Sequence, residues 1–231
     1  MISSHLKAGS FEALTRLRMK SLGPVSPIEF IPIAEKTKLI IPIGEKVMIS
    51  TLRFLKRLDE QGIDDIVISV NISAIELLQP DFAGRLLGLI ASMGVDPKCV
   101  GIEITESVFA ADYEAVNRII LRLRGAGIHL SIDDFGTGYS SLAREEELKV
   151  NCLKIDKHFI DRLLEPDLDR AITGDIISMA HRLGHCAVAE GVEKESQKQY
   201  LITHGCDRMQ GFLFSRPLDE DDALALLKRH R

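Results

Sequence analysis

Short apolar runs alternate with longer amphipathic stretches along the whole chain. The runs have the length of buried strands, and the longer stretches repeat apolar residues at helical spacing. The pattern predicts seven strands, at residues 8–14, 66–72, 100–105, 129–133, 152–156, 186–190 and 209–214. It predicts helices at 28–36, 41–60, 80–93, 113–124, 168–183, 195–204 and 219–231. Ser26 and Pro27 have the residue types of an N-cap and a first helical position for the first helix.

Strands that are apolar throughout and alternate with helices are typical of a parallel sheet covered by helices. Most of these strands end in polar residues, namely Glu12, Asn71, Glu103, Asp133, Lys154 with Asp156, Glu190 and Gln210. Polar residues at successive strand ends describe the active face of a (β/α)8 barrel, whereas a doubly wound sheet gathers its site at one switch point. We therefore expect an α/β fold, a TIM-like (β/α)8 barrel, as a single domain over residues 1–231.

Composition narrows the class of protein. Of the 231 residues 45% are hydrophobic and 27% charged, and the net charge is −5, which predicts a soluble globular protein without a basic surface for DNA or RNA. No apolar run approaches the roughly 20 residues of a membrane-spanning helix, and the start of the chain does not look like a signal peptide. The four cysteines form no CxxC pair, which argues against a zinc ribbon or disulfide scaffold and for a reducing cytoplasm.

Asp133 and Asp134 are adjacent carboxylates followed by a loop with two glycines. Two such side chains repel each other, and a divalent metal ion relieves the repulsion; the alternative is an Asp-rich turn before the loop. With the other strand-end carboxylates they suggest a site for two metal ions, which would activate a water for phosphodiester cleavage. Lys154, the one cation of the set, has a competing interpretation as a Schiff-base lysine, against which the carboxylates argue.

Seven short motifs follow one another along about residues 10–218. They are Glu12-Ala13-Leu14, Val70-Asn71-Ile72-Ser73, EITES at 103–107, DDFGTGYSS at 133–141, Lys154-Ile155-Asp156, AEGVE at 189–193 and Gln210-Gly211-Phe212. Together they resemble the EAL domain family of bacterial cyclic di-GMP phosphodiesterases. The resemblance implies a barrel of the EAL type that hydrolyses cyclic di-GMP to linear pGpG with two Mg²⁺ or Mn²⁺ ions.

The resemblance also implies a role for each motif residue. The first metal ion would be bound by Glu12, Asn71, Glu103 and Asp133, and the second by Asp133, Asp134 and Glu190. The catalytic set would be Glu190, Lys154, which contacts the attacking water, and Asp156. The substrate would be bound by Arg16, at a phosphate, and by Gln210, which also supports the metal and water shell. Glu106 would anchor the loop after Asp134. Glu193 would support the site from outside, and the interpretation as a structural partner is stronger than that as a metal ligand.

Two departures from the family pattern affect these expectations. The upstream antiparallel strand of the family has no counterpart before Glu12, so either residues 2–7 form a substitute strand or the chain is a fragment or a truncated relative. The segment at 143–149 is charged where the family has an apolar-containing one, which puts the family's homodimer interface in doubt. The same segment could be only a solvated helix face.

Two alternative functions are also consistent with the sequence: a catalytically weak cyclic di-GMP receptor and an interaction scaffold. An upstream sensor or cyclase domain in a longer parent chain is a further expectation. Four histidines fit no metal-ligand spacing and are expected to be ordinary surface or core residues; these are His129, His158, His181 and His185.

Overall fold

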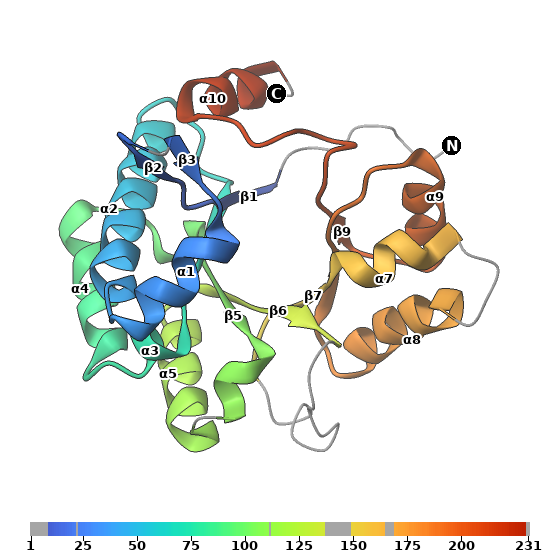
Figure 1. Cartoon of the computed structure of the whole chain (residues 1–231), viewed down its shortest axis with the longest axis horizontal. Coiled ribbons are helices and arrows are strands. Elements are labelled where there is room, and N and C mark those ends of the chain that lie inside the picture. The colour runs from blue at the N-terminus through green and yellow to red at the C-terminus, as the bar shows by residue number, and fades with distance from the viewer. Residues whose placement is uncertain (1–8, 22, 111, 137–148, 165–168, 230–231) are drawn as a thin grey trace. The chain divides into compact units, whose positions relative to one another are not determined.

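The computed structural model describes residues 9–21, 23–110, 112–136, 149–164 and 169–229 (Figure 1). The expectations for a substitute strand at 2–7, for most of the glycine loop and for the charged segment up to residue 148 lie outside these residues. The chain divides into two compact units, one of Met1–Ile102, Gly125–His129 and Pro217–Arg231, the other of Glu103–Arg124 and Leu130–Arg216.

The first unit contains parallel strands and the helices that follow them. Strand β1 (Ser10–Ala13) pairs in parallel with β4 (Val67–Asn71), and Glu12 lies opposite Ser69 in the register. The next strand, β5 (Val100–Thr105), begins in this unit. The helical elements are α1 (Pro27–Lys36), α2 (Ile40–Asp59), α3 (Ala74–Leu77), α4 (Phe82–Met93), the 3-10 turn η1 (Pro97–Cys99) and α10 (Glu220–Arg229). A small antiparallel hairpin, β2 (Leu17–Met19) with β3 (Gly23–Val25), separates β1 from α1.

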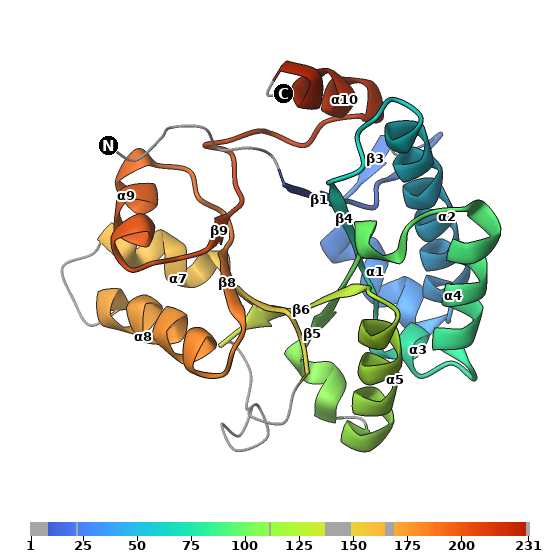
Figure 2. The same ribbon diagram turned by 180° about the vertical axis from the view of Figure 1, so that it is seen from behind.

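The second unit continues the alternation. Four consecutive strands lie side by side in parallel: β6 (His129–Phe135), β7 (Cys152–Ile155), β8 (Cys186–Ala189) and the short β9 (Arg208–Met209). Its helical elements are η2 (Glu106–Ala110), α5 (Tyr113–Gly125), α7 (Lys157–Asp161), η3 (Arg162–Leu164), α8 (Asp169–Arg182) and α9 (Glu195–Thr203). Figure 2 shows α7, α8 and α9 grouped beside β8 and β9.

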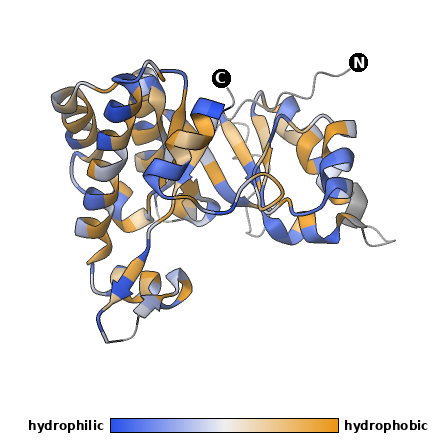
Figure 3. Ribbon diagram, turned by 90° about the horizontal axis from the view of Figure 1, so that it is seen from above, coloured by the Kyte–Doolittle hydropathy of each residue, from blue (hydrophilic) through white to orange (hydrophobic). Residues whose placement is uncertain are grey.

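Burial explains why these segments fold as they do. In α2, Met48, Leu52, Leu55 and Leu58 recur at helical spacing and are buried, while the opposite face is polar. Figure 3 shows this division of hydrophobic and hydrophilic residues along the helices. The first five residues of β5 are buried, as expected for a parallel strand covered on both faces.

The predicted elements are confirmed with shifts of a few residues at their ends, with one exception. The strand predicted at 209–214 is wrong after Met209. The chain turns there, because the amides of Phe214 and Ser215 both donate to the carbonyl of Gly211. The β2–β3 hairpin was not predicted, since Leu17, Arg18 and Met19 are all exposed and give no alternation.

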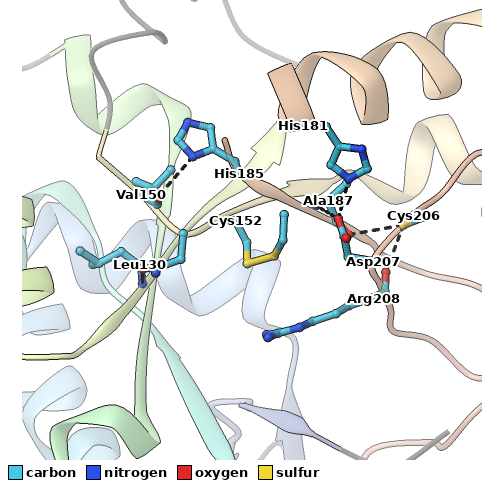
Figure 4. Close-up of a disulfide and its surroundings, with 11 residues drawn as sticks. Leu130, Val150, Cys152, His181, His185, Ala187, Cys206, Asp207 and Arg208 are labelled. Atoms are coloured by element: carbon cyan, nitrogen blue, oxygen red, sulfur yellow. Dashed lines mark hydrogen bonds and ion pairs between the residues drawn. A yellow bond between two sulfur atoms is a disulfide. The ribbon is translucent and has the colours of Figure 1, made fainter. Parts of the chain in front are cut away.

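The cysteine prediction is wrong for one pair. Cys152 and Cys186 are register partners on β7 and β8, their Cα atoms lie 4.4 Å apart, and they form a disulfide (Figure 4). Their separation of 34 residues along the chain concealed this pairing, because parallel strands are joined through an intervening helical segment. Cys99 and Cys206 are free thiols.

Across the part of the chain that the structure describes, no helix combines the length and apolarity needed to cross a membrane.

Candidate functional site

The two adjacent aspartates lie at an irregularity of β6. Ile132 pairs with Leu153 and Phe135 pairs with Ile155, so two residues of β6, Asp133 and Asp134, lie opposite one residue of β7. Asp134 adopts a left-handed backbone with φ of 53°, and its amide donates to Asp133 Oδ1 at 3.0 Å. This β-bulge breaks the alternation of side chains, and the strand continues to Phe135 instead of ending at Asp133 as predicted.

Lys154 lies opposite the bulge and contacts three carboxylates of the second unit. Its Nζ is 2.5 Å from Glu190 Oε1 and 3.3 Å from Asp133 Oδ1, and it also forms an ion pair with Glu103. The Lys154 side chain is only 3% exposed. Three of the side chains come from the C-terminal halves of β5, β6 and β7 and the fourth, Glu190, directly follows β8, in keeping with the predicted strand-end pattern.

Asp134 and Asp156 form a second pair of neighbouring carboxyl groups. The pKa of Asp134 is raised, first by burial and then by the nearby charges of Asp133 and Asp156. Asp156 also caps α7, because its Oδ1 accepts from the amide of His158 at 2.8 Å. The structure thus places Asp156 beside Asp134 and gives it a structural role that the sequence did not indicate.

Glu12 and Asn71 meet within the first unit. The Asn71 Nδ2 donates to Glu12 Oε1 at 2.6 Å, between the adjacent strands β1 and β4. Arg16 follows β1 and is exposed, and its guanidinium donates to the carbonyl of Thr15 at 3.1 Å. Glu12 and Asn71 are therefore brought together as predicted, and Arg16 is accessible to an anion.

Gln210 and Glu106 both belong to the second unit. The backbone amide of Gln210 donates to the carbonyl of Ala189, and the backbone carbonyl of Gln210 accepts from the amide of Val192, so hydrogen bonds join the end of β9 to the residues flanking Glu190. The Gln210 residue itself is exposed. Glu106 is buried at the start of η2, directly after β5, and the loop that it was predicted to anchor lies mostly outside the described residues.

Glu193 forms an ion pair that sequence reasoning missed. Its Oε1 is 3.1 Å from the Nζ of Lys157, the first residue of α7. The only signal in the sequence was the position of Lys157 directly after Asp156, which did not distinguish it from an ordinary helix lysine.

Two of the four histidines have clear structural partners near the disulfide (Figure 4). His181 Nε2 is 2.8 Å from Asp207 Oδ2, and the same oxygen accepts from the amide of Ala187. His185 is buried, with its Nδ1 3.1 Å from the carbonyl of Val150. Both rings pair with protein groups away from the carboxylates around Lys154.

The donor set around Lys154 has the chemistry of a site for hard divalent cations. Glu103, Asp133 and Glu190 supply oxygen donors that Mg²⁺ and Mn²⁺ prefer, and the single charge of Lys154 does not balance three carboxylates. Burial is the first cause that raises the pKa of Asp134, and the negative charges of Asp133 and Asp156 raise it further. No three acidic, cysteine or histidine side chains among the described residues are already grouped as a metal site. The fit therefore rests on the chemistry of the donors.

The alternating strands and helices, with polar residues at the strand ends, define an α/β protein of the TIM-like (β/α) barrel class. The sequence model of the EAL domain family matches residues 2–217. The chain belongs to the EAL domain family.

The chain is similar in sequence to two proteins of Pseudomonas aeruginosa whose names state an activity. The chain is 37% identical over 214 residues to the bifunctional diguanylate cyclase/cyclic di-GMP phosphodiesterase MucR, covering 93% of this chain and 31% of MucR. It is 34% identical over 207 residues to a cyclic di-GMP phosphodiesterase, covering 90% of this chain and 35% of that protein. The chain thus spans about a third of the length of these relatives.

Solved structures share the fold over nearly the whole chain. The PaMucR phosphodiesterase in complex with c-di-GMP matches with a TM-score of 0.87 and 37% identity, covering 92% of this chain and 86% of that one. The EAL enzyme Bd1971, in its cAMP and cyclic-di-GMP bound form, matches with a TM-score of 0.89 and 31% identity, covering 95% of this chain and 60% of that one. These matches confirm the predicted fold class.

Proposed function

We propose that this chain hydrolyses one phosphodiester bond of cyclic di-GMP and releases linear pGpG. The observation that carries the proposal is the buried Lys154 with Glu103, Asp133 and Glu190 around it, in a member of the EAL domain family. Relatives and solved structures named for cyclic di-GMP cleavage or binding support the choice of substrate.

The assignment of the metal ligands rests on membership of the EAL domain family. Glu12, Asn71, Glu103 and Asp133 would bind one divalent ion, and Asp133, Asp134 and Glu190 the other. Two such ions would supply a water of lowered pKa and would stabilise the attacking and leaving oxygens of the cleaved phosphodiester.

The chain's own residues orient the reactants. The Lys154 ammonium, held by Glu190 and Asp133, donates a hydrogen bond to the attacking water or to a phosphate oxygen. Asp156, fixed by its bond to the His158 amide, helps to hold that water. Because the substrate is an anion, the exposed guanidinium of Arg16 binds a phosphate, and Gln210 binds the substrate and supports the metal and water shell.

A turnover assay tests the proposal. Purified protein is incubated with cyclic di-GMP and Mn²⁺, and pGpG is followed by chromatography. We expect pGpG with Mn²⁺ or Mg²⁺, none after chelation, and loss of turnover in both Glu12→Ala and Glu190→Ala. The matched control is Glu195→Ala, which removes an exposed carboxylate on α9 and is expected to keep wild-type turnover. Turnover by both site variants at the wild-type rate would contradict the proposal.

The turnover assay together with a calorimetric binding measurement separates the rival functions. Binding of cyclic di-GMP by calorimetry with no pGpG formed would identify a receptor, and absence of binding would identify an interaction scaffold. A cytoplasmic location, a homodimer and an upstream sensor or cyclase domain remain predictions. The bifunctional name of MucR, of which this chain covers 31%, is in keeping with the last of these.

A further inference from the structure

The peptide that follows Glu190 is packed against a lysine that the proposed chemistry does not use. Gly191 has φ of +65°, in the left-handed region. A Cβ atom at this position would lie 2.6 Å from Cδ and 2.8 Å from Cβ of Lys157. The aliphatic stem of Lys157 therefore covers the backbone of Gly191 so closely that only glycine fits beneath it.

The charged end of Lys157 joins the same loop to α7. Its Nζ is 3.1 Å from Glu193 Oε1 and 2.6 Å from Asp161 Oδ1, one turn further along α7. The pair with Asp161 fixes the ammonium on its own helix, and the pair with Glu193 connects that helix to the loop after β8.

Other bonds hold the C-terminal side of this loop. The amides of Glu193 and Lys194 donate to Gln197 Oε1, and Gln197 Nε2 donates to the carbonyl of Ile160 in α7. The Val192 amide donates to the carbonyl of Gln210. Lys157 covers the remaining part, at Gly191, next to the residue that contacts Lys154.

We propose that Lys157 is a positioning residue for Glu190: its stem covers Gly191 and its ammonium binds Glu193, which fixes the backbone that presents the Glu190 carboxylate. The expected effect on turnover rests on the proposed phosphodiesterase function. The expected effect on the rigidity of the loop after Glu190 rests on the contacts of that loop alone.

The ion pairs by themselves do not stabilise the fold much. The Lys157 side chain is 44% exposed, and exposed pairs contribute little to stability. The effect of Lys157 lies in geometry, because a small misplacement of a catalytic group lowers the rate strongly. Loss of a residue that orients such a group from behind costs about 10- to 100-fold in activity or metal affinity.

Three variants separate the parts of the side chain. Lys157→Ala removes stem and charge, Lys157→Met keeps the stem alone, and Lys157→Arg keeps both. The matched control is Lys198→Ala, because Lys198 also forms an ion pair with a helix carboxylate, Glu195. Hydrogen exchange of the Val192 and Glu193 amides and the turnover of cyclic di-GMP with Mn²⁺ are measured for each protein.

For Lys157→Ala we expect faster exchange at both amides and a kcat lower by about 10- to 100-fold with little change in KM. Lys157→Met lies between Ala and wild type, Lys157→Arg restores both readouts, and Lys198→Ala changes neither. If Lys157→Ala does not fold, Lys157→Met and Lys157→Arg decide.

Two results would overturn the inference. One is wild-type exchange in Lys157→Ala, whatever the activity. The other is faster exchange with unchanged kcat, which would mean that the loop is tied down without positioning Glu190. Absence of turnover in the wild type would instead reject the proposed function, and the exchange rates would still decide whether Lys157 fixes the loop.

Discussion

Lys154 is a charged side chain in a buried position. Removing an ammonium from water is costly unless carboxylates compensate it, and each carboxylate brings a desolvation cost of its own. Here one lysine is surrounded by Glu103, Asp133 and Glu190, so the group as a whole stays negative when all four are ionised. A divalent cation that binds these carboxylates is therefore expected to stabilise the folded protein as well as to support its activity.

Lys154→Met tests this dependence. Without the ammonium the three carboxylates are left uncompensated, and we expect the free energy of unfolding of the metal-free protein to fall by about 3–5 kcal/mol. Saturating Mn²⁺ should recover part of that loss, because it supplies positive charge to the folded state only. Urea unfolding with and without Mn²⁺ measures both effects. Lys198→Met, at a pair whose carboxylate Glu195 is exposed, should change stability by less than about 0.5 kcal/mol. Equal losses for the two variants would contradict the expectation.

His185 gives the molecule a pH dependence near neutrality. Burial lowers the pKa of the ring below its ordinary 6.5, and the charges of Arg124 and Lys149 act in the same direction. The unfolded chain then takes up the proton first as the pH falls. The neutral ring contributes to the free energy of unfolding above pH 6.5. This contribution is lost as the pH falls through the lower folded pKa, at up to about 1.4 kcal/mol per pH unit. Urea unfolding from pH 7.5 to 5 should show a steeper loss for the wild type than for His185→Asn. Parallel profiles would exclude His185 as the cause.

At the scale of elements, the turn after β4 depends on close packing against α2. Glu76 accepts from the amide and the hydroxyl of Ser73, at 3.0 and 2.7 Å, and so closes the capping box of α3 two residues after Asn71. A Cβ atom at Gly44 of α2 would lie 2.8 Å from Cδ of Glu76. The buried carboxyl group therefore fits only because residue 44 has no side chain.

Gly44→Ala is expected to lower the free energy of unfolding by about 1–3 kcal/mol, as overpacking does. Gly88→Ala in α4 is the matched control, because nothing lies within 4 Å of a Cβ atom there. It should raise stability by about 0.5–1 kcal/mol through helix propensity. Chemical denaturation of the three proteins gives the comparison, and a neutral Gly44→Ala would show that Glu76 can move aside.

The elements that sequence reasoning identified are those with a buried periodic face. The strand β5 has the predicted bounds because its first five residues are buried and, apart from Glu103, have no polar side chain, and α2 is recovered because its leucines repeat at helical spacing. The hairpin at Leu17–Met19 was missed because short exposed strands carry no pattern.

The candidate site shows the same limit. The carboxylates and Lys154 were found because strand ends mark a common face. The bulge at Asp133 and the contact of Lys157 with Gly191 depend on register and on a glycine at positive φ, which one sequence does not reveal.

At the scale of the whole molecule, the disulfide is a constraint between distant parts of the chain. Cys152 and Cys186 are 34 residues apart, and closing a loop of that size stabilises a fold by about 3–4 kcal/mol in the chain-entropy model. We expect the oxidised protein to be more stable than the reduced one by up to this amount in urea. Cys152→Ser should match the reduced wild type and should not respond to reductant. An equal response of both proteins to reductant would place the effect elsewhere.

The crosslink also changes what a break in the backbone does. The loop that it closes contains α7, η3 and α8, including Arg162 and Arg182. A protease that cuts once at Arg162 therefore yields two fragments that still migrate as one species on a non-reducing gel and separate only after reduction. The same nicked protein retains β7 and β8 joined side by side, so the strands that carry Lys154 and precede Glu190 stay covalently linked without the peptide chain between them.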